Sequence, residues 1–207
     1  MAEEKDVQVS TTTGRLYGTI DIPATGGPYP VLLIISGSGP TDRDGNSQMV
    51  KRPNNSLKMT GAWLAENGIA ALRYDKRGVG ESESAAGQVE KTVFEDMITD
   101  AECWIELLRG DNRFSSIGIL GHSEGSLVGM CVASRENVDF FISVAGAGRP
   151  AAEVIREQLS SQPGFIKKKA YPILDELAAG RQVKQVPKLL NNLFKPELQP
   201  YLISWNS

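Results

Sequence analysis

Histidine is almost absent from this sequence, since His122 is the only one among 207 residues. Cysteine is nearly as scarce, with Cys103 and Cys131 alone. Zinc sites draw on clusters of these two residue types, so we expect no metal site, and no motif implies an organic cofactor. Both cysteines fall in apolar helical patterns, which favours buried free thiols over a disulfide.

Long apolar runs and a strong charge imbalance are also missing. No apolar run approaches the roughly 18 residues of a membrane span, and the N-terminus MAEEKDVQVS lacks the apolar segment of a signal peptide. We therefore expect a cytoplasmic protein, with a removed signal peptide as the open alternative. The formal net charge is -3, and the lysine run at 167–169 is typical of a solvated helix face. Neither a nucleic acid nor a membrane is an expected partner.

Apolar residues are present in quantity, at 41% of the chain, which is enough for one sizeable core. Strand patterns and helix patterns alternate along the first two thirds of the sequence. The first two strands form an antiparallel hairpin, and the alternation that follows predicts a mostly parallel sheet with helices on both faces. The predicted strands are 6–11, 15–22, 30–35, 69–74, 116–121 and 138–145.

The pattern changes after Gly148. Residues 150–196 predict two or three helices, broken at Pro163-Gly164, Gly180 and Pro187, with no strand among them. We therefore expect an α/β core over residues 1–148 and a helical cap or lid over residues 149–207. The apolar side chains of this cap either face a ligand or only hold the cap together.

The stretch Gly121-His122-Ser123-Glu124-Gly125 matches the pattern G-x-S-x-G between a buried strand and a helix. In that context the serine takes a strained backbone conformation that projects its hydroxyl above the sheet. Larger side chains at the two glycines would collide with the adjoining strand and helix. The pattern predicts Ser123 as a nucleophile.

Acyl transfer by a serine also needs N–H donors for the developing oxyanion. The amide of Glu124, the residue after the nucleophile, is one predicted donor. The loop Ser36-Gly37-Ser38-Gly39 follows the strand at 30–35 and supplies the second, from Ser38 or else from Gly37. The alternative is that this loop is a plain turn between strand and helix.

Three segments in this order and spacing, PVLLIISGSGPTDRDGNS, ALRYDKRGVGES and GILGHSEGS, resemble the α/β-hydrolase superfamily. They are most similar to bacterial serine esterases whose third-strand loop reads G-S-G-P-x-D-R-D. The resemblance covers residues 6 to about 205 and implies an α/β-hydrolase fold with hydrolysis of small-molecule carboxylic esters. It implies Ser123 as the nucleophile and the Ser38 and Glu124 amides as the oxyanion hole.

The sequence departs from this family in two places. Ser36 replaces the usual loop histidine, which leaves the backbone donors intact. In the family, two further strands carry the acid and the histidine of the triad after the cap, and the chain stops where they are due. We therefore expect a truncated hydrolase with impaired activity, because loss of a triad member costs roughly 10⁴- to 10⁶-fold in turnover.

Other residues are weak substitutes for that histidine. His122 is expected to pack beneath the turn, since neighbouring side chains there diverge. Six charged residues near the expected pocket mouth are candidates for a base, of which Asp75 and Arg77 are better explained as partners that stabilise the turn: Asp42, Asp44, Asp75, Lys76, Arg77 and Glu124.

Two further expectations follow from the missing triad members. A non-catalytic module that binds a small apolar ligand is the alternative function. Strand 138–145 would form an open apolar edge, so homodimerisation, aggregation or pairing with a second polypeptide is expected.

Overall fold

The structure is a computed structural model, and it describes residues 3–47 and 52–206. Its strands form one six-stranded sheet in the order β1-β2-β4-β3-β5-β6. Each strand overlaps one that the sequence predicts. Their bounds are β1 (Glu3–Ser10), β2 (Arg15–Ile22), β3 (Tyr29–Ile35), β4 (Ala70–Tyr74), β5 (Phe114–His122) and β6 (Phe140–Val144).

The sheet is mixed but mostly parallel. β1 pairs with β2 and β2 with β4 in antiparallel fashion, whereas β4, β3, β5 and β6 run parallel to one another. β3 lies between two neighbours, and residues 31–35 are at most 2% exposed, which explains their uninterrupted apolar sequence. The predicted fold class is therefore confirmed.

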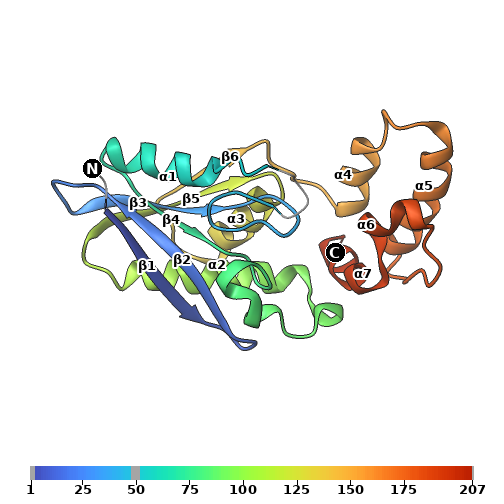
Figure 1. Ribbon diagram of the computed structural model, residues 1–207, viewed down its shortest axis with the longest axis horizontal. Coiled ribbons are helices and arrows are strands. Elements are labelled where there is room, and N and C mark those ends of the chain that lie inside the picture. The colour runs from blue at the N-terminus through green and yellow to red at the C-terminus, as the bar shows by residue number, and fades with distance from the viewer. Residues whose placement is uncertain (1–2, 48–51, 207) are drawn as a thin grey trace. The chain divides into compact units, whose positions relative to one another are not determined.

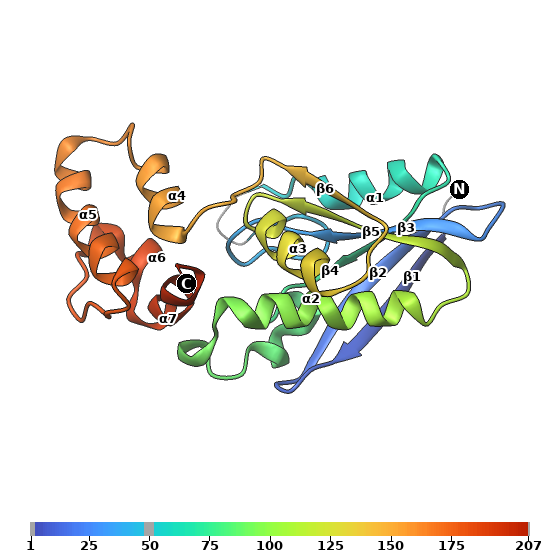
Figure 2. The same cartoon turned by 180° about the vertical axis from the view of Figure 1, so that it is seen from behind.

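Helices cover both faces of this sheet (Figure 1; Figure 2). Leu64 of α1 packs in one cluster with Leu32 on one face. On the other face α3 lies against Ile119, and Trp104 of α2 packs against Tyr74 with ring centroids 5.6 Å apart. The bounds are α1 (Ser56–Glu66), α2 (Phe94–Arg109) and α3 (Glu124–Arg135).

The chain divides into two compact units, Met1–Ala86 with Ile98–Ala147, and Gly87–Met97 with Gly148–Ser207. The second unit is helical. The first turn of α2 belongs to it, because Phe94 stacks on Trp205 at 5.7 Å and its N–H donates to Ser204 Oγ at 2.7 Å. The helices of this unit are α4 (Ala151–Gln158), α5 (Gly164–Ala178), α6 (Asn191–Phe194) and α7 (Gln199–Trp205). No described helix is long and apolar enough to cross a membrane.

Neither cysteine forms a disulfide in the described part of the chain, and both are half-buried rather than buried as predicted. Cys103 precedes the buried Trp104, and Cys131 precedes the buried Val132. Since each residue turns a helix by about 100°, these neighbours of buried positions reach only the border of the packed face. Partial burial raises the pKa of the Cys103 thiol, so this thiol is a poor nucleophile at neutral pH.

Candidate active site

Ser123 occupies the corner where β5 ends and α3 begins. Its φ of 54° and ψ of -119° lie in a region that residues with a side chain rarely adopt. Its N–H donates to the Val144 carbonyl at 2.9 Å, and its carbonyl accepts from the Ser126 and Ala147 amides at 3.0 and 3.2 Å. Hydrogen bonds from β6, from α3 and from the segment after β6 thus hold this strained residue in place.

The two glycines of the motif are sterically required. A Cβ on Gly121 would lie 2.4 Å from the Gly125 carbonyl oxygen. A Cβ on Gly125 would lie 2.3 Å from the Ile35 carbonyl oxygen and 2.5 Å from that of Ser36. The obstructing atoms are backbone atoms of α3 and of the end of β3, so the predicted reason for glycine is confirmed.

The loop after β3 lies directly beside this corner. A Cβ on Gly37 would be 3.3 Å from Ser123 Cβ and 3.0 Å from His122 Nδ1. The next residue, Ser38, is exposed. In the part of the chain that the structure describes, neither the Ser38 N–H nor the Glu124 N–H donates a hydrogen bond, so both donors are available to a ligand.

Lys76 joins the loop to the corner. It follows β4 and is 8% exposed, and its Nζ lies 2.7 Å from the Gly37 carbonyl oxygen and 3.0 Å from Glu124 Oε1. Glu124 is 3% exposed. The ammonium and the carboxylate therefore neutralise each other, which a buried charge requires.

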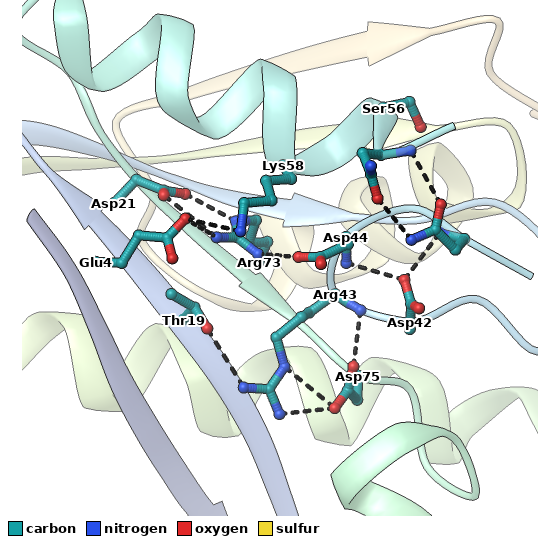
Figure 3. A network of polar contacts seen from close by, with 12 residues as sticks. Glu4, Thr19, Asp21, Asp42, Arg43, Asp44, Ser56, Lys58, Arg73 and Asp75 are labelled. Atoms are coloured by element: carbon teal, nitrogen blue, oxygen red, sulfur yellow. Dashed lines mark hydrogen bonds and ion pairs between the residues drawn. The ribbon is translucent and has the colours of Figure 1, made fainter. Parts of the chain in front are cut away.

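Two arginine clusters fix the distal part of the same loop to the sheet (Figure 3). Arg73 of β4 is 1% exposed, and it donates to Asp21 Oδ2 at 2.9 Å and also pairs with Asp44. Arg43 donates to Asp75 Oδ2 through Nε at 3.1 Å and Nη2 at 2.7 Å. Such charge-assisted bonds hold a loop more firmly than neutral ones, so residues 42–44 anchor the loop that carries Gly37.

The expectation for His122 is wrong in one respect. The residue belongs to the corner, but its ring is exposed rather than packed beneath it. His122 is the last residue of β5, where the packed part of the strand ends, and its ring lies beside Gly37 of the loop. Among the described residues no hydrogen bond joins His122 to Ser123.

The charged candidates for a base already have partners. Asp42 accepts from the Asp44 and Asn46 amides at 3.0 and 2.8 Å. The Glu81 amide donates to Asp75 at 3.1 Å, which confirms the predicted role of Asp75 in stabilising the turn, whereas Arg77 pairs with Asp100 of α2 at 2.6 Å. The remaining three have the partners given above: Asp44, Lys76 and Glu124.

Comparison with known proteins agrees with this geometry. The profile of the family described as "Serine aminopeptidase, S33" matches residues 55–200. The chain is 31% identical over 199 residues to Esterase EstD of Thermotoga maritima. That alignment covers 96% of this chain but 42% of the relative, so the chain spans less than half of the relative's length.

Solved structures share the fold. The Pyrococcus furiosus esterase PF2001 has a TM-score of 0.60 at 17% identity, covering 88% of this chain and 64% of that one. The α/β hydrolase GrgF from Penicillium sp. sh18 has a TM-score of 0.59 at 20% identity, covering 84% and 55%. With the serine corner, the adjoining loop and the family match together, this chain belongs to the serine aminopeptidase S33 family of α/β hydrolases.

Proposed function

We propose that this protein is a serine hydrolase of small-molecule carboxylic esters that works through an acyl-enzyme, with Ser123 as its nucleophile. The observation that carries this proposal is the strained backbone of Ser123 at a strand-to-helix corner, beside a glycine loop with a free amide. The esterase name of the Thermotoga maritima relative favours an ester over a peptide substrate.

In the proposed reaction, Ser123 Oγ bonds to the ester carbonyl carbon while its proton passes to a base. The Ser38 and Glu124 amides, with Gly37 beside them, stabilise the oxyanion. The alcohol leaves with that proton, and water then releases the acid and restores the hydroxyl. We propose that these 207 residues alone perform this reaction poorly, because they hold one histidine, whose ring makes no hydrogen bond to Ser123 within the described part of the chain.

Labelling with a fluorophosphonate, read by intact mass and peptide mapping, tests the nucleophile. We expect one adduct on Ser123, formed slowly in the absence of a base, and its loss in Ser123→Ala. Ser134→Ala is the matched control, because Ser134 is an exposed serine on α3, the helix that follows Ser123. An adduct that persists in Ser123→Ala, or that maps to another serine, contradicts the proposal.

A non-catalytic module that binds a small apolar ligand is the second candidate. The observation in its favour is that the charged groups near the corner are already engaged with partners. Saturable binding of an uncleaved aryl ester, unchanged in Ser123→Ala and without an adduct, would favour this function over hydrolysis.

A further inference from the structure

Lys76 contacts Glu124, one of the two proposed oxyanion donors, and Gly37, which precedes the other donor, Ser38. The strand order β4-β3-β5 places the ends of three parallel strands side by side. Lys76 follows β4, Gly37 follows β3 and Glu124 follows β5, so all three lie at one edge of the sheet. The lysine Nζ bridges the other two, at 2.7 and 3.0 Å.

The Gly37 carbonyl and the Ser38 N–H belong to one peptide group. A trans peptide is planar, so its C=O and N–H point in opposite directions. The Gly37 carbonyl points toward the buried Lys76 ammonium. The Ser38 N–H of the same peptide group therefore points away from that ammonium. The residue itself is exposed, and in the described chain Ser38 has no other polar contact that would fix it.

We infer that Lys76 is a positioning residue, which orients the Ser38 amide through the Gly37 carbonyl and holds Glu124 by its side chain. This inference rests on the proposed function. It goes beyond it, because it assigns to one buried lysine the orientation of the Ser38 amide and a contact with the side chain of Glu124. Its alternative is a purely structural role, in which the lysine only neutralises a buried carboxylate.

Two variants of the full chain separate these roles. Lys76→Met leaves Glu124 buried without its cation and is expected to lower stability. Lys76→Met with Glu124→Met replaces the ion pair by apolar side chains of similar volume, which often costs little stability. Both leave the Gly37 carbonyl without its donor, and the double variant remains informative if the single one fails to fold.

The first measurement is the NMR order parameter of the Ser38 amide, which needs no activity. We expect about 0.85 in the wild type and a fall below about 0.6 in both variants. A Ser38 amide that stays rigid in either folded variant overturns the positioning role, since the lysine then only neutralises Glu124.

The second measurement is hydrolysis of an aryl acetate after subtraction of the Ser123→Ala rate. We expect kcat to fall about 100-fold in the double variant while KM changes by less than about twofold, because oxyanion donors act in the transition state. An unchanged kcat overturns the positioning role and leaves the nucleophile intact. If no turnover depends on Ser123 even with imidazole added as a base, the proposed function fails, and the order parameter alone decides the role of Lys76.

Discussion

Ser123, the proposed nucleophile, carries a cost to the fold. Its φ of 54° and ψ of -119° are disfavoured for any residue with a Cβ, at a cost of about 1–3 kcal/mol. The surrounding hydrogen bonds from the Ser126 and Ala147 amides keep it there. A folded protein retains such strain only where the neighbouring structure enforces it, which is the pattern expected of a functional corner.

This strain predicts opposite effects of glycine at two serines of the same segment. Ser123→Gly should be more stable than Ser123→Ala by about 1 kcal/mol, because glycine adopts a positive φ without steric cost. Ser134 lies in the regular backbone of α3, so Ser134→Gly should instead lower the free energy of unfolding by about 0.5 kcal/mol relative to the wild type. Urea unfolding measures both values, and a Ser123→Gly variant no more stable than Ser123→Ala would refute strain at this corner.

The contacts of Lys76 could not be predicted from its residue type and its position in the sequence. The sequence placed it among candidate bases after the strand at 69–74, whereas its Nζ is committed to Gly37 and Glu124. The order in which β4, β3 and β5 adjoin decides this contact, because it brings their carboxyl ends together. The sequence pattern predicts where the strands lie along the chain. It does not predict the order in which the strands adjoin in the sheet, because that order depends on tertiary packing.

Helix α1 contains a glycine that its own helical propensity does not favour. Gly61 lies in the helix interior, where alanine is better by about 1 kcal/mol. A Cβ at this position would lie 2.2 Å from Asp21 Oδ2, and that carboxylate is bound to the buried Arg73. The helix therefore packs its glycine against an ion pair of the sheet.

Gly61→Ala should lower the free energy of unfolding by about 2 kcal/mol, because disturbing a buried ion pair outweighs the gain in helix propensity. Gly164→Ala is the matched control. Its Cβ would meet nothing within 4 Å, so we expect no loss and a gain of up to about 1 kcal/mol. Thermal and urea unfolding compare the two, and a stabilised Gly61→Ala would mean that Asp21 moves freely.

Strand β6 lies at the border of the sheet, and its only partner strand among the described residues is β5. Ile142 and Val144 are 40% and 43% exposed. An exposed apolar edge with unpaired backbone groups pairs readily with another strand.

We therefore predict association of this chain that depends on concentration, measured by light scattering coupled to size exclusion. Val144→Lys should weaken it, because a lysine on an edge strand opposes pairing. Val89→Lys is the control, since Val89 is equally exposed at 43% but lies outside the sheet. Association that is equally sensitive to both changes, or a wild type that stays monomeric at high concentration, would rule out this edge as the interface.

Over the whole chain, local patterns predicted more than contacts between distant segments. Alternating and continuous apolar patterns located all six strands. Two features could not be read from such patterns. Arg73 interrupts a buried strand because Asp21, 52 positions earlier, neutralises it. Residues 87–97 join the C-terminal helices through Phe94 and Ser204, 110 positions apart.

At the scale of the whole chain, the remaining question is which group accepts the proton of the Ser123 hydroxyl. His122 is the only histidine of the 207 residues, and in the described chain it makes no hydrogen bond to Ser123. The Ser123 hydroxyl should then stay near its ordinary reactivity, with turnover roughly 10⁴- to 10⁶-fold below that of a complete triad. The strained corner and the proposed oxyanion donors are both present, so under the proposed function we expect the proton acceptor to be limiting.

A base supplied from solution should therefore restore part of the reaction. Imidazole also reacts directly with an aryl acetate, and the rate measured with Ser123→Ala gives this background. We expect the wild-type rate minus this background to rise with imidazole concentration. His122→Ala should leave that difference within about twofold, because its ring is not hydrogen-bonded to the nucleophile. Rapid Ser123-dependent turnover without imidazole would contradict this account, and its loss in His122→Ala would identify His122 as the base after all.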